Sequence, residues 1–163
     1  MNYKDHDLET IDCDNNTDLK WCVAEENEEK GITSDAIITW LEKSTLDSSK
    51  YKLYIGSEKD IYAPSYSSTL FSGFSNVKLI NFNNFDTSNV TGMTRMFYVC
   101  ESLNKLYLGN FDVKAVIENE KFFSKPSSSL NVYFDDEESK NSFVAKFEIP
   151  ENIYTSVGSP ATN

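Results

Sequence analysis

The feature that most constrains the fold of this chain is an internal repeat of 26 residues. Residues 70–95 align with residues 96–121 without a gap, and a third, partial copy follows at the same offset. The clearest matches are Phe71 with Phe97, Asn84-Phe85-Asp86 with Asn110-Phe111-Asp112, Val90 with Val116, and Met96-Phe97 with Phe122-Phe123. A fixed period in this size range is the signature of repeat folds, in which each unit buries its apolar face against its neighbours.

Each copy contains one short segment in which apolar and polar residues alternate. The positions expected to point inward are Ile80 and Phe82, Leu106 and Leu108, and Val132 and Phe134. Their spacing, apolar-x-x-apolar-x-apolar, is that of leucine-rich repeats, where each repeat adds a strand to a parallel sheet. The sequence therefore predicts an α+β fold, with a short leucine-rich-repeat-like solenoid and a small parallel sheet over residues 51–135.

An acidic N-terminal cap is predicted before the solenoid, over residues 1–50. This segment contains 13 acidic and 5 basic residues, whereas residues 51–112 contain five of each. Alternation of Leu19, Trp21 and Val23 predicts one strand in the cap. Ser34, followed by apolar residues at helical spacing, predicts one helix that ends near Lys43.

A C-terminal helix and tail are predicted after the solenoid, over residues 136–163. The segment from Asp136 to Phe147 begins with acidic residues, contains apolar residues at helical spacing and is followed by Pro150. Acidic residues favour the first turn of a helix, and a proline just beyond the last turn is typical of its end.

The repeat resembles a known family. The string FDTSNVTGMTRMF (85–97), the segment from Cys100 to Asp112 and the upstream segment 54–77 are similar to the repeats of BspA-like bacterial surface proteins of the DUF285 type. This resemblance implies a leucine-rich-repeat-like module, usually on secreted or lipid-anchored proteins, that contacts other proteins.

Composition argues against several classes of function. A formal net charge of -11 has the wrong sign for gripping nucleic-acid phosphates, so direct nucleic-acid binding is not expected. The chain contains no run of about 18 apolar residues, so the sequence predicts no membrane span. The single histidine, His6, and the lack of a nucleophile motif predict that the chain is not an enzyme, and we expect no cofactor.

Metal binding and reactive thiols are also not expected. Asp14, Asn16, Asp18 and Glu25 have the spacing of an EF-hand loop, but Leu19 stands where that loop requires glycine, so we predict no metal site. Cys100 occupies the place that a phenylalanine fills one repeat earlier and is expected to be a buried apolar residue.

Location has two interpretations. The polar start of the chain lacks the pattern of a secretory signal, which favours a cytoplasmic protein as the sequence is written. The alternative is the cell surface or secretion, if the sequence is a piece of a longer protein.

Strand alternation also predicts where a partner would bind. If the inward positions are correct, their neighbours point outward in columns 26 residues apart. These outward positions are Leu79, Lys105 and Asn131; Asn81, Tyr107 and Tyr133; and Asn83, Gly109 and Asp135. The two tyrosines either contact a protein partner or pair with one another, since cross-strand aromatic pairs stabilise sheets.

Two hypotheses for function follow. The first is a non-catalytic protein–protein interaction module of the bacterial surface-repeat type, with its partner on the outward columns. The second is a small intracellular inhibitor from a phage or other mobile element that blocks a basic groove of a nucleic-acid-handling enzyme. Its site would be the acidic cluster Glu25, Glu26, Glu28 and Glu29, because acidic side chains can mimic phosphates.

Overall fold

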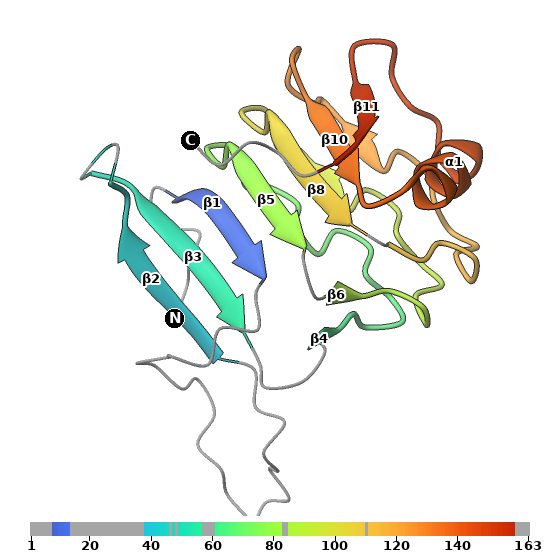
Figure 1. Cartoon of the computed structure of the whole chain (residues 1–163), viewed down its shortest axis with the longest axis horizontal. Helices are drawn as coiled ribbons and strands as arrows, with labels where there is room; N and C mark the ends of the chain where they lie inside the picture. Colours follow the sequence, from blue (N-terminus) through green and yellow to red (C-terminus); the bar gives the residue numbers. More distant parts are fainter. Residues whose placement is uncertain are drawn as a thin grey trace, which may run out of the picture.

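The computed structural model describes residues 8–13, 38–45, 47, 49–56, 61–82, 85–109 and 111–158. Within these ranges the chain forms mostly short parallel strands and one helix towards the C-terminal end (Figure 1). The elements are β1 (Leu8–Cys13), β2 (Ile38–Lys43), β3 (Tyr51–Gly56), β4 (Ile61–Tyr62), β5 (Leu79–Phe82), β6 (Phe85–Asp86), β7 (Phe97–Tyr98), β8 (Lys105–Gly109), β9 (Phe123–Ser124), β10 (Asn131–Phe134), α1 (Glu137–Lys146) and β11 (Tyr154–Val157).

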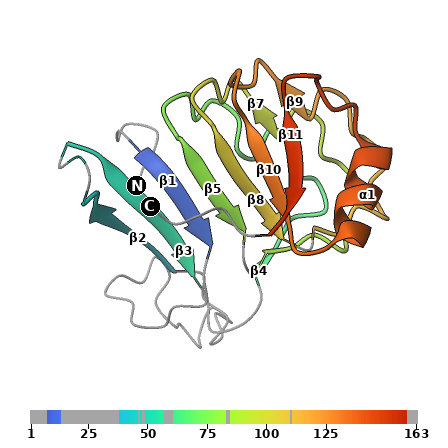
Figure 2. The ribbon, with the colours of Figure 1, turned by 45° about the horizontal axis from the view of Figure 1, so that its top comes forward.

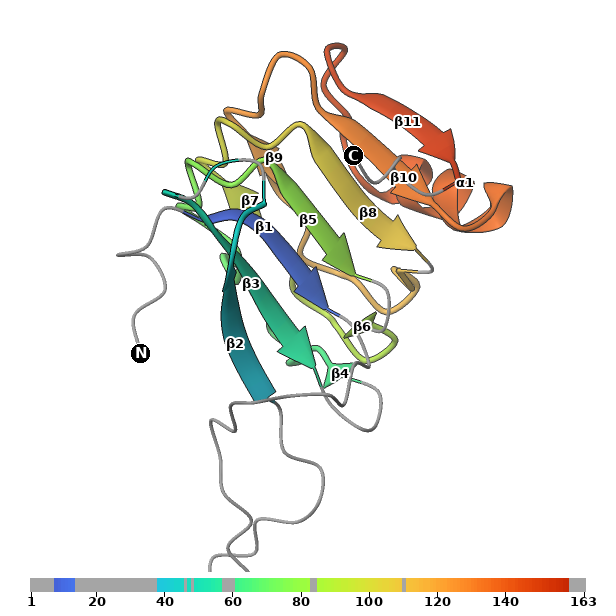
Figure 3. The ribbon, with the colours of Figure 1, turned by 60° about the vertical axis from the view of Figure 1, so that its left-hand side comes forward.

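The main sheet has seven strands in the order β11-β10-β8-β5-β1-β3-β2 (Figures 1 and 3). All neighbouring strands are parallel except β2, which is antiparallel to β3. Strands β5, β8 and β10 come from successive copies of the repeat, and Ile80, Leu106 and Val132 are partners across them. The 26-residue offset predicted from the sequence is therefore the register of the sheet.

The backbone path outside the main sheet repeats with the same period. Phe97 of β7 pairs with Phe123 of β9, and the main-chain N–H of Phe71 donates to the carbonyl of Met96, as that of Phe97 does to Phe122, both at 3.1 Å. Left-handed backbone angles recur every 26 residues at two positions, Thr69, Arg95 and Lys121 (φ 60, 55 and 52°) and Gly73, Val99 and Lys125 (φ 83, 58 and 52°). Successive copies thus follow one local conformation.

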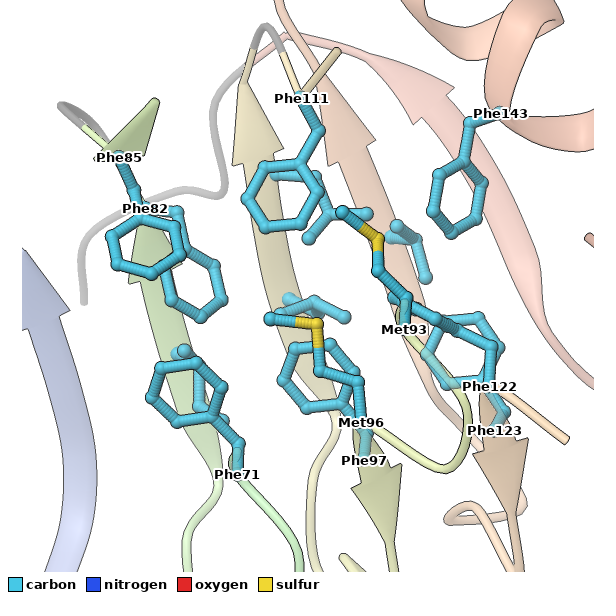
Figure 4. Close-up of a cluster of buried hydrophobic side chains, with 14 of the residues drawn as sticks. Phe71, Phe82, Phe85, Met93, Met96, Phe97, Phe111, Phe122, Phe123 and Phe143 are labelled. Atoms are coloured by element: carbon cyan, nitrogen blue, oxygen red, sulfur yellow. The ribbon is translucent and has the colours of Figure 1, made fainter. Parts of the chain in front are cut away.

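A cluster of phenylalanines fills the space behind the main sheet (Figure 4). The rings of Phe71 and Phe97 stack with centroids 5.7 Å apart, and those of Phe97 and Phe123 stack at 6.1 Å. The inward residues of β5, β8 and β10 meet this cluster and are fully buried: Ile80, Phe82, Leu106, Leu108, Val132 and Phe134. All six positions that the alternation predicts to point inward do so.

Helix α1 confirms the prediction of a helix over residues 136–147. Asp136 is its N-cap and accepts a hydrogen bond from the main-chain N–H of Ser139 at 2.7 Å. Phe143 and Phe147 pack against Phe122, with ring centroids 5.2 and 4.3 Å apart. The helix therefore covers the apolar end of the third copy, next to β10 and β11 (Figure 2).

The helix predicted to end near Lys43 is wrong. Residues Ile38–Lys43 form strand β2, where Leu41 pairs with the buried Leu53 of β3. A β-branched start (Ile38, Thr39) suits a strand, and pairing with a distant strand overrides the local helical spacing. The strand predicted at residues 19–23 lies outside the described residues.

Strand β1 was not predicted, and it joins the N-terminal segment to the repeat. It lies between β3 and β5 and is parallel to both, with Ile11 the partner of Leu53 on one side and of Ile80 on the other. The described part of residues 1–50 therefore extends the main sheet beyond the first copy of the repeat.

Candidate functional site

The face of the main sheet turned away from the phenylalanine cluster, here called the outer face, carries two of the predicted columns. Leu79, Lys105 and Asn131 are partners across β5, β8 and β10. One step along the strands, Asn81, Tyr107 and Tyr133 are partners in the same way. The structure thus brings together six of the residues predicted to contact a partner, although they are up to 54 residues apart in the sequence.

The third predicted column does not form as expected. Gly109 pairs with Phe134 and not with Asp135, because the register shifts by one residue between Tyr133 and Phe134. Gly109 has a φ of 58°, which breaks the regular extended backbone at this point, and its carbonyl accepts from the Asp135 N–H at 3.1 Å. Asn83, the remaining member of the column, lies outside the described residues.

Tyr107 and Asp135 form the best-defined polar contact on the outer face. The Tyr107 side chain is only 9% exposed, and its hydroxyl donates a hydrogen bond to the Asp135 carboxylate. Burial, followed by this hydrogen bond, raises the pKa of the Tyr107 phenol to about 12. Tyr107 is therefore held in one orientation, and the exposed Asp135 is fixed beside it.

Tyr133 has a different environment from Tyr107, its partner in the sheet. It is half-buried, as are the neighbouring Asn131 and Lys105. Of the two tyrosines, Tyr133 offers the larger surface to an incoming molecule. The sequence alone treats the two tyrosines alike, because they occupy equivalent positions of the repeat.

The amide oxygen of Asn81 is buried and accepts no hydrogen bond from the described part of the chain. A buried acceptor without a donor is destabilising by roughly 1 to 3 kcal/mol. Asn81 lies next to Tyr107 in its column, so this unsatisfied group is at the centre of the outer face.

Four outer-face residues were missed by the sequence reasoning because they lie outside the repeat. Register places Lys52 and Tyr54 of β3 and Tyr154 and Ser156 of β11 on the same side as the two columns. The sequence signal in β3 was the alternation of its residues. The buried Leu53 and the partly buried Tyr51 and Ile55 face the core, so Lys52 and Tyr54 between them face outward. Strand β11 gave little signal, because it does not continue the 26-residue offset: Tyr154 pairs with Asn131, which is 23 residues earlier.

The alternative acidic site lies outside the described residues. Glu25, Glu26, Glu28 and Glu29 all fall in residues 14–37, as do the residues with EF-hand spacing. Elsewhere in the chain, the residues that the structure describes contain no group of three or more His, Cys, Asp or Glu side chains able to hold a metal ion. Cys100 is buried, as predicted, and its thiol donates to the Phe71 carbonyl.

No helix in the described ranges is long and apolar enough to cross a membrane. Among known proteins, neither a curated protein nor a solved structure matches the chain. One family model, described as a Mycoplasma protein of unknown function, DUF285, matches residues 66–147, which is half of the chain and includes β5 to β10 and α1. The chain therefore belongs to the DUF285 family.

Proposed function

We propose that this chain is a non-catalytic protein–protein interaction module that binds a protein partner through the outer face of its main sheet. The observation that carries the proposal is the register of β5, β8 and β10, which aligns Leu79, Lys105 and Asn131 in one column and Asn81, Tyr107 and Tyr133 in the next. Proteins built from stacked repeats commonly use such an extended face for binding.

The proposal includes the architecture that presents this face. The three copies of the repeat stack as a short leucine-rich-repeat-like solenoid, in which each turn rests on the one before it. Three observations support this architecture: the constant 26-residue register, the left-handed positions that recur in every copy, and the stacked rings of Phe71, Phe97 and Phe123.

The side chains of the outer face suit a protein partner. Tyr133 supplies aromatic contact area with little side-chain entropy to lose, and Lys105 and Asn131 beside it supply hydrogen-bond donors. Tyr107 contributes indirectly, because it fixes the position of the Asp135 carboxylate. Interfaces concentrate their binding energy in a few such aromatic and polar residues.

Affinity capture followed by titration calorimetry tests the binding face. The chain, Tyr133→Ala and the control Tyr62→Ala are compared as baits, since Tyr62 is 62% exposed on β4, outside the main sheet. We expect one protein that the chain and Tyr62→Ala retain and that Tyr133→Ala binds at least about fivefold more weakly, the equivalent of about 1 kcal/mol. A partner that binds all three baits equally would show that the outer face is not the site.

Insertion of an additional repeat tests the architecture separately. A second copy of residues 96–121, placed after Lys121, keeps every 26-residue register and should add one turn to the stack. We expect the longer chain to unfold in one transition with a larger urea m-value, because more surface is exposed on unfolding. Aggregation, or an unchanged m-value, would contradict the solenoid without bearing on where the partner binds.

A further inference from the structure

Strand β11 forms one edge of the main sheet, so only its β10 side is paired with a strand in the part of the chain that the structure describes. The N–H groups of Tyr154 and Gly158 donate to the carbonyls of Leu130 and Phe134, at 3.0 and 2.9 Å, on the β10 side. Alternate residues of a strand direct their backbone groups to opposite sides, so Thr155 and Val157 direct theirs away from β10. No strand lies on that side in the described part of the chain.

This edge lacks the features that usually prevent pairing with another chain. Edge strands are commonly protected by charged side chains or proline. At the opposite edge of the sheet, β2 carries the exposed Glu42 and Lys43. Strand β11 has the sequence Tyr-Thr-Ser-Val, with no charge and no proline, and Tyr154 and Val157 are 65% and 42% exposed.

We infer that β11 is a dimerisation edge, which pairs antiparallel with β11 of a second copy of this chain about a two-fold axis at Ser156. Thr155 and Val157 are the two residues of β11 whose backbone groups point away from β10, and they are separated by one residue. In the two-fold arrangement each Thr155 lies opposite Val157 of the other copy, so these two residues of both strands form hydrogen-bonded pairs.

The second copy is favoured as the occupant because β11 is complementary to itself: its two outward-directed residues, one residue apart, match those of an identical antiparallel strand. The β10–β11 ladder would extend by one more strand with no change of conformation in either copy. Val157, which is 42% exposed, is the register partner of the buried Phe134 and so lies on the α1 side of the sheet, where pairing would cover it.

Net charge adds a condition that the dimer must satisfy. Each chain carries a formal charge of -11, so two copies repel at long range. Added salt screens this repulsion and leaves the backbone hydrogen bonds at the uncharged edge largely unaffected. Dimerisation should therefore become stronger as salt increases, the opposite of an interface built on ion pairs.

Analytical ultracentrifugation of the full chain against edge variants tests the inference. Thr155→Pro removes an N–H that faces away from β10, and Val157→Lys places a charge at the edge. We expect each change to raise the dimer dissociation constant at least tenfold, whereas the control Ile117→Lys, at a residue 80% exposed outside the main sheet, leaves it unchanged. A monomer at all concentrations, or a dimer that survives both edge variants, would overturn the inference.

A cysteine at residue 156, which lies on the proposed two-fold axis, tests the register of the two β11 strands directly. Ser156 faces Ser156 of the other copy in a pair without direct hydrogen bonds, where Cα atoms are about 4.5 Å apart, within the range of a disulfide. Under mild oxidation Ser156→Cys should form a covalent dimer. Thr155→Cys should not, because the two copies of residue 155 are offset along the strands. Equal cross-linking of both variants would exclude this register.

Discussion

Replacement of Leu106 by alanine tests whether the copies are stacked through their inward columns. Leu106 is fully buried, with Ile80 and Val132 as its partners on the two neighbouring strands, both also fully buried. Removing its isobutyl group leaves a cavity that these β-branched neighbours, fixed in the ladder, fill poorly. We therefore expect the upper part of the usual range for Leu→Ala, a loss of about 3 to 5 kcal/mol in the free energy of unfolding.

Urea unfolding followed by tryptophan fluorescence measures this loss, and the adjacent Lys105→Ala provides the matched control. Lys105 points to the outer face, so its replacement should lower the free energy of unfolding by less than about 1 kcal/mol. Leu106→Ala combined with Val132→Ala should depart from additivity by at least about 0.5 kcal/mol, because the two side chains share one cavity. Equal losses for Leu106→Ala and Lys105→Ala, or strict additivity of the pair, would refute the stacking of the columns.

Three further predictions concern the backbone and two ionisable groups. Gly73→Val should lower the free energy of unfolding by about 1 kcal/mol in urea, because the φ of Gly73, 83°, lies beyond the range of about 50 to 70° that L residues tolerate and in which Val99 lies at the equivalent position (φ 58°); no loss would contradict this backbone conformation. The pKa of Tyr107 is raised from about 10 to about 12 by burial and by Asp135, so its stabilising effect is complete below pH 10 and is lost as the pH rises towards 12. Thermal unfolding across this range should show a loss that Tyr107→Phe reduces. The Ser139 N–H lowers the pKa of the Asp136 carboxyl, so α1 should lose stability as the pH falls below about 4; Asp136→Ala should destabilise α1 and reduce this dependence in circular dichroism.

The inward columns were predictable from the sequence because burial restricts them. Each of Ile80, Leu106 and Val132 fills the same place in successive copies of the repeat, and only apolar residues can do so when the site is completely buried. The period then follows from chemical class alone, even though few residues are identical between copies. The helix after Asp136 was predictable for a similar reason, since its cap and its first-turn acids are local signals.

The third outer column shows where prediction of strand partners from the 26-residue offset fails. The sequence places Asp135 opposite Gly109, but the left-handed φ of Gly109 shifts the ladder by one residue. A glycine permits this conformation without requiring it, so the sequence did not reveal that the register would change there. The same shift brings Asp135 to the hydroxyl of Tyr107, a contact that no spacing rule would have suggested.

The N-terminal strands were beyond local reasoning because their stability comes from distant partners. Strand β2 has apolar residues whose spacing also fits a helix, and its pairing with β3 decides the outcome. Strand β1 is parallel to both of its neighbours, β3 and β5, which follow it by at least about 40 residues in the chain. Local patterns contain no information about which distant strands are available to pair.

The outer columns differ from the inward ones in a way that bears on function. Between successive copies the inward sequence stays apolar, but the outward sequence changes from Leu79 to Lys105 to Asn131 in one column, and in the other Asn81 is followed by tyrosine in both later copies. The main requirement of the fold at these positions is that the residue fits a β-strand, so the fold does not determine which side chain stands there. Under the function that we propose, the choice of partner can therefore depend on outer-face residues such as Lys105 and Asn131 with little effect on stability. An exchange of Lys105 and Asn131, the outward residues at which β8 and β10 differ, should leave the free energy of unfolding almost unchanged while weakening binding of the partner that we propose.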